Sequence, residues 1–347
     1  MVNSQAIEQI LLDALETKSF PSVVAIIGNA KKTLWRFVGG VNEYGGENVT
    51  QQTYYDLASL TKVVSTLPAI LKLVSEGALK LDDTVGKFIH NAGWFQTPSL
   101  ADVTIKQLLT HSSGLPAWKP LFAWVSERQT AVANVLQSQL EHPTGTFVYS
   151  DLGFIALGAI TERITKMRQD VFVKEQIFDP LDMKHTRYGP IEKLPTASTE
   201  DCPWRNQVLR GVVHDENAFC LSQVAGHAGL FGTAEDIATY ARAWLSLDSR
   251  LGKERVLQAA IEEQLSQDGV RRGLGWALKG ENAFGGSRAT LKGFGHTGFT
   301  GTSLWIEPEE NWFAVLLTNR VHPSRQCGAN IHQIRKTFHD AVSKELA

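Results

Sequence analysis

Apolar residues near the start of the chain recur with the spacing of an amphipathic helix. Ile7, Ile10, Leu11, Ala14 and Leu15 lie one, three or four positions apart. This spacing places them on one face of a helix, and such a face is normally buried against another element. The pattern therefore predicts an opening helix that packs on the rest of the fold.

Two short runs rich in β-branched and aromatic residues follow this helix, at 22–28 (SVVAIIG) and 33–39 (TLWRFVG). A short polar stretch separates them, which is typical of an antiparallel hairpin. The same strand pattern returns near the end of the chain, before a last helical pattern over about 328–346. These later strands are predicted at 273–278, 301–306 and 312–318.

Between these strand-rich ends the pattern is mainly helical. Helices are predicted over 131–140, 152–166 and 234–247, and the last begins at the capping signal Thr233-Ala-Glu-Asp236. Strands at both ends favour one sheet assembled from the two termini, because unpaired edge strands promote aggregation.

We therefore expect an α+β fold with an antiparallel sheet formed from N- and C-terminal strands and flanked by helices. Residues 1–84 and 268–347 would form this sheet domain, and residues 85–267 an inserted, mainly helical domain. The cleft between the two is the expected place for an active site.

Composition and charge narrow the class of protein. The chain has 347 residues, of which 43% are hydrophobic and 20% charged, as in an ordinary globular enzyme. The formal net charge of -2 provides no basic surface for nucleic acid. We expect a small-molecule or short-peptide substrate and no nucleic-acid partner, and the oligomeric state stays open.

The N-terminal residues carry no recognisable export signal, because Glu8, Asp13 and Glu16 interrupt the segment that would have to be apolar. No apolar run approaches the roughly 20 residues needed to span a bilayer. We expect no membrane span and a cytoplasmic location, or a periplasmic one if an export signal is missing or unrecognised. The cysteines, at 202, 220 and 327, are odd in number and cannot form a disulfide framework.

The first candidate catalytic residues lie in the segment Ser59-Leu60-Thr61-Lys62, at the start of a helical pattern that ends near Gly77. Residues three apart on a helix face the same way, so the Lys62 ammonium lies within reach of the Ser59 hydroxyl. A serine hydroxyl is a weak nucleophile and needs such a neighbour to attack a carbonyl. The pattern alone is common by chance, and Pro68 predicts a kink in this helix.

Two further segments combine polar side chains with turn residues. Tyr149-Ser150-Asp151 precedes the helix predicted from residue 152, where Asp151 would also suit a helix cap and Tyr149 the core. His296-Thr297-Gly298 leads into the strand predicted at 301–306, where it would also suit an ordinary turn.

Taken together, the three segments resemble the serine penicillin-recognising superfamily in order and spacing. The pattern S-x-x-K is followed about 90 positions later by Y-S-D and about 145 positions after that by H-T-G. The segments 108–116 (LLTHSSGLP) and 226–231 (GHAGLF) also resemble blocks of that superfamily. It includes class C β-lactamases, D-alanyl-D-alanine carboxypeptidases, D-aminopeptidases and related esterases.

The resemblance implies a catalytic role for Ser59, Lys62 and Tyr149. Ser59 would form an acyl-enzyme. Lys62 would either favour the ionised form of Tyr149 or accept the Ser59 proton itself. The backbone N–H groups of Ser59 and Phe299 would form the oxyanion hole. No cofactor and no metal is expected, and the implied substrate-binding residues are Asp151, His296, Thr297 and Gly298.

Two of these positions depart from the commonest pattern of the superfamily. Asp151 stands where many relatives have Asn, and a carboxylate there would raise the pKa of Lys62, which favours Tyr149 as the principal base. His296 stands where a K-T-G triad has Lys, and a neutral imidazole would hold a substrate carboxylate less well. Strong β-lactamase activity is therefore not expected.

The function expected from the resemblance is that of a serine hydrolase cleaving an amide, in a D-amino-acid peptide, a muropeptide or a β-lactam-like compound. A carboxylesterase using the same residues is the alternative, and a non-catalytic penicillin-binding-like sensor is a third. His111 is expected to be structural. His214 and His227 lack the spacing of a known metal motif, and Trp118 is a candidate for the pocket wall.

Overall fold

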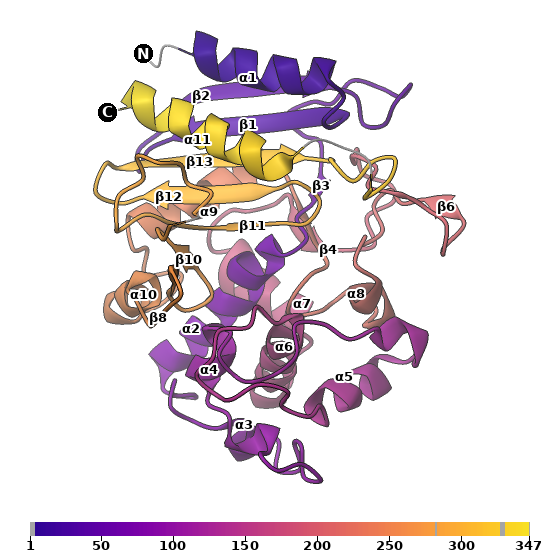
Figure 1. Cartoon of the computed structure of the whole chain (residues 1–347), viewed down its shortest axis with the longest axis vertical. Coiled ribbons are helices and arrows are strands. Elements are labelled where there is room, and N and C mark those ends of the chain that lie inside the picture. The colour runs from indigo at the N-terminus through magenta and orange to yellow at the C-terminus, as the bar shows by residue number, and fades with distance from the viewer. Residues whose placement is uncertain (1–3, 282, 327–329, 347) are drawn as a thin grey trace.

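The computed structural model describes residues 4–281, 283–326 and 330–346. Its centre is an eight-stranded antiparallel sheet in the order β2-β1-β13-β12-β11-β10-β9-β8, in which the N-terminal hairpin lies beside the last strand of the chain (Figure 1). The expected sheet built from both termini is confirmed. Its strands are β1 (Ser22–Gly28), β2 (Thr33–Gly40), β8 (Leu265–Gln267), β9 (Val270–Arg272), β10 (Ala277–Leu278), β11 (Phe294–Thr297), β12 (Ser303–Glu307) and β13 (Trp312–Thr318).

Both faces of the sheet are covered, which explains why the middle of β1, residues 23–27, is entirely apolar. Val23, Ala25 and Ile27 pack with α1 (Gln5–Glu16) and α11 (Ile331–Leu346). Val24 and Ile26 point to the other face and belong to the cluster that includes α9 (Ala234–Leu245). Alternate residues of a strand face opposite sides, so a strand between two helical layers is buried along its whole length.

The rest of the chain lies below this sheet in Figure 1 and is mainly helical. Its α-helices are α2 (Leu67–Glu76), α3 (Val85–Phe88), α4 (Ile105–Leu109), α5 (Arg128–Leu136), α6 (Asp151–Thr165), α7 (Gln169–Val173), α8 (Glu216–Cys220) and α10 (Glu254–Ile261). Short 3-10 turns lie at η2 (Leu100–Asp102) and η3 (Leu121–Ala123), and π-helical turns at η1 (Lys62–Thr66) and η4 (Lys174–Phe178).

Two smaller sheets lie outside the eight-stranded sheet. A three-stranded sheet has the order β3 (Tyr55–Asp56), β7 (Leu230–Gly232), β4 (Thr186–Tyr188), and a separate pair is β5 (Asp201–Cys202) with β6 (Gln207–Val208). Helix α9 packs on β1, β12 and β13 although it lies within 85–267. The proposed division of the chain into a sheet domain and an inserted domain stays a prediction.

Several element boundaries differ from the sequence-based expectation. The strand expected at 273–278 is reduced to β10, because Gly275 adopts a left-handed φ of 73° that interrupts it. The helix expected at 131–140 is α5, which ends at Leu136. Helix α11 begins at Ile331, and the predicted start at 328 lies outside the described residues, as does Cys327.

The helix after Ser59 accommodates Pro68 without an interior break. The π-helical turn η1 comes first, and Pro68 falls in the first turn of α2. A proline lacks an N–H group, and because Thr66 and Leu67 both have helical dihedral angles, it is the wider π-helical turn directly before Pro68 that accommodates it. The helix ends at Gly77 as expected, with a left-handed φ of 80°.

No helix in the described part of the chain is long and apolar enough to cross a membrane.

Candidate active site

Ser59 lies on a sharp turn between β3 and η1. Ala58, directly before it, has a left-handed φ of 46°, which a residue with a Cβ adopts at some cost. The Ala58 N–H donates a 2.8 Å hydrogen bond to Asp56 Oδ1, and this bond holds the turn. The Ser59 side chain is thereby presented, partly exposed, at the wall of a pocket.

Lys62 is fully buried one helical turn after Ser59. Its ammonium donates to Ser59 Oγ at 2.9 Å and to the His227 carbonyl at 3.3 Å, and it forms an ion pair with Asp151 Oδ1 at 2.7 Å. Burial lowers the pKa of Lys62, but the nearby Asp151 carboxylate and Tyr149 raise it by more, so the pKa lies above its ordinary value. Lys62 is therefore charged at neutral pH. This agrees with the expectation from the sequence that a carboxylate at position 151 raises the pKa of Lys62.

Tyr149 and Asp151 reach this ammonium from the start of α6, and Ser150 lies between them in the chain. Ser150, rather than Asp151, is the helix cap: its side chain accepts from Gly153 N–H and donates to the Pro116 carbonyl at 2.7 Å. The capping role suggested for Asp151 is thus wrong, because its carboxylate faces Lys62. The ring centroid of Tyr149 lies 4.9 Å from Lys62 Nζ.

His111 is buried against Tyr149, with ring centroids 4.4 Å apart. Its Nδ1 accepts a 3.0 Å hydrogen bond from Ser150 N–H, and its carbonyl accepts one of 2.8 Å from Val148 N–H. Burial, with the charges of Arg272 and Lys62, holds the pKa of His111 well below its usual range. A neutral imidazole that accepts at Nδ1 carries its proton at Nε2.

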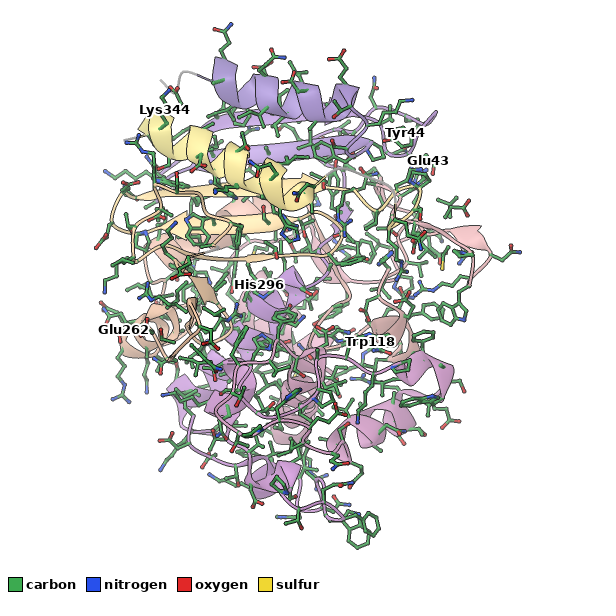
Figure 2. The ribbon with its side chains drawn as sticks, viewed as in Figure 1. Glu43, Tyr44, Trp118, Glu262, His296 and Lys344 are labelled. Carbon is green, nitrogen blue, oxygen red and sulfur yellow. The ribbon has the colours of Figure 1, made fainter. Side chains whose placement is uncertain are left out.

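His296, Thr297 and Gly298 form the end of β11 and the turn after it. His296 is buried, and its Nδ1 donates to the Thr297 carbonyl at 2.8 Å. Burial and the charges of Arg272 and Lys62 hold its pKa well below the usual value, so the imidazole is neutral at pH 7. Figure 2 shows His296 near the middle of the molecule, at the lower side of the large sheet.

The turn after β11 packs directly on the turn that carries Ser59. A Cβ on Gly298 would lie 2.5 Å from the Leu57 carbonyl oxygen, so only glycine allows this approach. The hydroxyls of Thr300 and Thr302 donate to the carbonyls of Asp56 and Leu57, at 2.7 and 3.1 Å. The two turns are therefore held together by the close backbone approach at Gly298 and by two hydrogen bonds from threonine hydroxyls to backbone carbonyls.

Helix α11 also supports this turn. The buried Arg335 guanidinium donates to the carbonyls of Gly298 and Thr302, at 2.7 and 2.8 Å. Phe299 lies between these two residues with 49% of its surface exposed, and its ring stacks on His214 with centroids 5.7 Å apart. The proposed oxyanion hole from the N–H groups of Ser59 and Phe299 stays a prediction.

A pocket of about 280 Å³ opens beside Ser59. Among its lining residues are several that the sequence analysis did not assign to the site: His214, Asp215, Glu216 and Arg325. The Arg325 guanidinium pairs with Glu216 and with Glu200, both at 2.6 Å. From the sequence, His214 is only a candidate metal ligand that lacks the spacing of a known motif, and its position at the pocket depends on tertiary packing.

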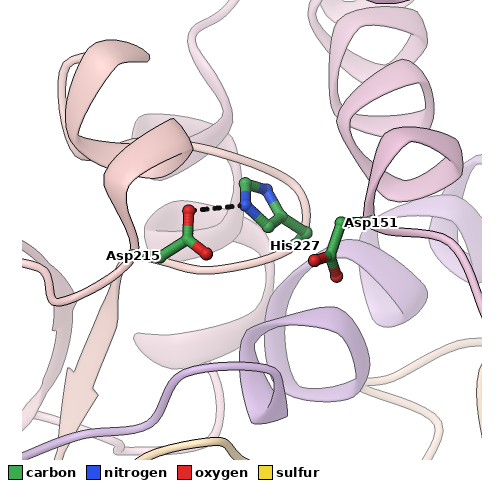
Figure 3. Close-up of side chains that lie close together, drawn as sticks. All are labelled: Asp151, Asp215 and His227. Carbon is green, nitrogen blue, oxygen red and sulfur yellow. Dashed lines mark hydrogen bonds and ion pairs between the residues drawn. The ribbon is translucent and has the colours of Figure 1, made fainter. Parts of the chain in front are cut away.

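Three of the nearby side chains could offer metal ligands. Ligand atoms of Asp151, Asp215 and His227 lie within 4.8 Å of one another (Figure 3). His227 Nε2 and Asp215 Oδ1 are already hydrogen-bonded at 2.9 Å, and Asp151 is paired with Lys62. A divalent cation there would have to displace that hydrogen bond and would be repelled by the ammonium. The geometry thus favours an ion-pair network over a metal centre.

Comparisons with known proteins agree with this arrangement. A family model described as Beta-lactamase matches residues 7–337. The chain is 32% identical to a protein of Escherichia coli (strain K12) named "Putative D-alanyl-D-alanine carboxypeptidase", over 87% of this chain and 79% of the relative. It is 30% identical to a protein of Bacillus subtilis (strain 168) named "N-acetylmuramyl-L-alanine amidase", over 87% and 78%.

Solved structures show the same fold at lower identity. A penicillin-binding protein homologue from Caulobacter crescentus superposes with a TM-score of 0.77 at 19% identity, covering 98% of this chain and 96% of that one. EstCE1, a hydrolase with promiscuous acyltransferase activity, has a TM-score of 0.75 at 17% identity, with coverage of 97% and 98%. The chain thus belongs to the Beta-lactamase family and is a serine hydrolase.

Proposed function

We propose that this protein hydrolyses an amide bond of a small peptide or muropeptide through an acyl-enzyme on Ser59. The observation that carries the proposal is the buried Lys62 ammonium, which lies 2.9 Å from Ser59 Oγ and 2.7 Å from Asp151. The names of the relatives, an amidase and a D-alanyl-D-alanine carboxypeptidase, support an amide in a cell-wall-derived compound.

In this mechanism Ser59 Oγ attacks the carbonyl carbon and passes its proton to the ionised form of Tyr149, the phenolate, which the Lys62 ammonium would favour. Lys62 stays charged and stabilises the negative charge that develops on the two oxygens. The N–H groups of Ser59 and Phe299 would bind the oxyanion, each contributing roughly 3 kcal/mol in the transition state. Tyr149 then protonates the leaving amine, and water hydrolyses the acyl-enzyme by the reverse proton path.

Asp151, His296, Thr297 and Gly298 would position the substrate around this carbonyl. His296 is neutral, because burial and nearby cations lower its pKa. It would therefore hold a substrate carboxylate less strongly than the Lys of a K-T-G triad does, so we propose weak hydrolysis of β-lactams. An ester is the second candidate substrate. Its leaving group needs less proton donation than an amine does, so the absence of the K-T-G Lys should harm ester hydrolysis less.

The site would lie where the sheet region, residues 1–84 and 268–347, meets the insertion of residues 85–267. We also propose that the protein works in the cytoplasm, which is supported by Cys202 and Cys220 forming no disulfide within the described residues, as is usual in a reducing compartment. Cell fractionation with an antibody tests the location, and recovery in the periplasmic fraction would contradict it.

The acyl-enzyme is tested with a fluorescent penicillin and a fluorophosphonate probe. Wild type should be labelled and Ser59→Ala should not, with the probe mass localised to Ser59 by mass spectrometry. Absence of labelling in wild type under all conditions would favour a non-catalytic sensor. Steady-state rates with a D-alanyl-D-alanine peptide, a muramyl peptide and a p-nitrophenyl ester then separate the amide from the ester. Turnover of the ester alone would contradict the amide proposal.

A further inference from the structure

A series of aromatic side chains, in which Trp118, Trp204 and Phe219 are exposed and Phe122 is partly buried, begins at the pocket and extends away from it. Trp118 lines the pocket with Ser59 and is labelled near α8 in Figure 2. Ring centroids continue from Trp118 to Phe122 at 6.3 Å, from Phe122 to Trp204 at 4.9 Å, and from Trp204 to Phe219 at 6.1 Å. Trp204 is 50% exposed and Phe219 39%. We name Trp118, Phe122, Trp204 and Phe219 the aromatic strip.

The aromatic strip is fixed to the pocket wall by Arg205. The Arg205 guanidinium lies 5.1 Å from the ring centroid of Trp204 and 4.3 Å from that of Phe219. It also donates to the carbonyls of Val213 and His214, at 2.5 and 3.1 Å, and His214 lines the pocket. Rings held in this way lose little conformational freedom when a ligand binds, which favours affinity.

The size of the pocket requires a larger substrate to continue outside it. A volume of about 280 Å³ is at the lower end for a ligand site and suits the groups around the scissile bond alone. An exposed aromatic surface that is continuous with such a pocket marks an extension of the binding site. The aromatic strip begins at the pocket wall, so it can contact the part of the substrate that extends out of the pocket from the scissile bond.

The chemistry of the aromatic strip favours a sugar ring as this next part. A sugar has C–H faces that pack on aromatic rings and hydroxyl edges that need hydrogen-bonding groups. Trp118, Trp204 and Phe219 expose their rings, and Glu216 and Arg325 supply charged groups at the pocket beside Trp118. We propose that the aromatic strip binds the N-acetylated sugar of a muropeptide whose amide bond lies at Ser59. This inference rests on the proposed function and specifies its substrate.

The test compares two substrates that differ only in the sugar. They are N-acetylmuramyl-L-alanyl-D-isoglutamine and N-(D-lactyl)-L-alanyl-D-isoglutamine, which keeps the lactyl group that joins the sugar to the peptide, and the released amine is measured with ninhydrin. Wild type should prefer the sugar-bearing substrate by about tenfold in kcat/KM, a factor typical for one aromatic contact. Trp204→Ala should abolish the preference by raising KM for that substrate, and should leave the sugar-free one unchanged within about twofold.

Trp94→Ala is the matched control, because Trp94 is an exposed tryptophan that packs on Phe95 and lies outside the aromatic strip. It should keep the full preference. A preference that survives in Trp204→Ala, or an equal loss for both substrates, would overturn the role of the aromatic strip. The unchanged rate on the sugar-free substrate also reports that the variant is folded.

A binding experiment separates failure of this inference from failure of the proposed function. Saturation-transfer NMR with N-acetylmuramic acid is recorded on Ser59→Ala and on Ser59→Ala combined with Trp204→Ala. Signal in the first and not in the second supports the aromatic strip even if neither peptide is hydrolysed, in which case the proposed function alone is wrong. Absence of signal in both overturns the aromatic strip whether or not the peptides are hydrolysed.

Discussion

Lys62 donates to Ser59 Oγ and to the His227 carbonyl and is paired with Asp151, and a hydrogen bond with Tyr149 also raises its pKa. A cation that donates to Ser59 cannot also take its proton, which supports the proposal that Tyr149 is the base. We predict that Tyr149→Phe lowers the acylation rate about a thousandfold, within the usual range for loss of a general base. Stopped-flow acylation with a p-nitrophenyl ester measures this. If Tyr149→Phe kept most of the rate while Lys62→Ala lost it, Lys62 would be the base.

The charge of Lys62 depends on Asp151. The pKa of Lys62 is higher in the folded protein than in the unfolded chain. The charged Lys62 therefore contributes fully to the stability of the fold below about pH 10.4, the ordinary pKa of lysine. This contribution is lost as the pH rises through the raised pKa of the folded protein. In Asp151→Asn burial should dominate and lower the pKa of Lys62. We predict that the alkaline limb of the kcat/KM profile then moves to lower pH.

At pH 7 the activity of Asp151→Asn should fall by no more than about tenfold, since the amide oxygen still accepts from the ammonium. Asp83→Asn is the control, because it removes the Asp83–Lys87 pair, in which Lys87 is largely exposed. An alkaline limb that stays in place in Asp151→Asn would mean that Asp151 does not govern the charge of Lys62.

His111 holds the backbone on both sides of Tyr149. Its carbonyl accepts from Val148 N–H, and its Nδ1 accepts from Ser150 N–H. This makes it a positioning residue. We predict that His111→Ala lowers kcat about a hundredfold with little change in KM, because the tyrosine hydroxyl moves relative to Ser59. His111→Asn should restore most of kcat, since Asn supplies an acceptor and tolerates the left-handed φ of 57°. Equal losses in the two variants would point to a merely structural role.

At the scale of elements, the end of β11 and the Ser59 turn meet at Gly298. A Cβ there would lie 2.1 Å from Thr302 Oγ1 and 2.5 Å from the Leu57 carbonyl, so Gly298→Ala must move the two turns apart. We predict a loss of about a hundredfold in kcat/KM, the usual effect of a shift near 1 Å in a catalytic group. Gly153→Ala, which meets only ordinary contacts 3.6 Å away, should keep its activity. Full activity in Gly298→Ala would show that this contact does not position Ser59.

Long elements could be predicted from their pattern, and short ones could not. β1, α6 and α9 carry enough apolar residues for their period to be visible. β8, β9 and β11 have three or four residues each, too few to show a pattern, and they exist because a neighbouring strand pairs with them.

The same limit applies to the candidate site. Ser59, Lys62, Tyr149 and His296 belong to short motifs with distinctive chemistry, so the sequence could group them. Asp215, by contrast, reaches the pocket only because α8 folds against it, and a sequence without contacts carries no signal of that. Tertiary packing also decided that Ser150 caps α6 and leaves Asp151 for Lys62.

At the scale of the whole molecule, the site draws on three distant stretches of the chain. Ser59 precedes the mainly helical region, Asp151 lies within it, and His296 comes from the C-terminal strands. Their relative positions therefore depend on contacts that join all three stretches, and one buried side chain provides such a junction.

Asn319, after β13, is that junction. Its Oδ1 accepts from the N–H and hydroxyl of Ser22, and its Nδ2 donates to the carbonyls of Asn42 and Ser198, at 2.8 to 3.1 Å. Asn319→Ala leaves these buried groups unpaired, which should lower the free energy of unfolding by about 3 kcal/mol in urea denaturation. Asn134→Ala on the exposed face of α5 should change it by less than about 0.5 kcal/mol. If Asn319→Ala were as stable as Asn134→Ala, the three stretches would have to be held together by the apolar core alone.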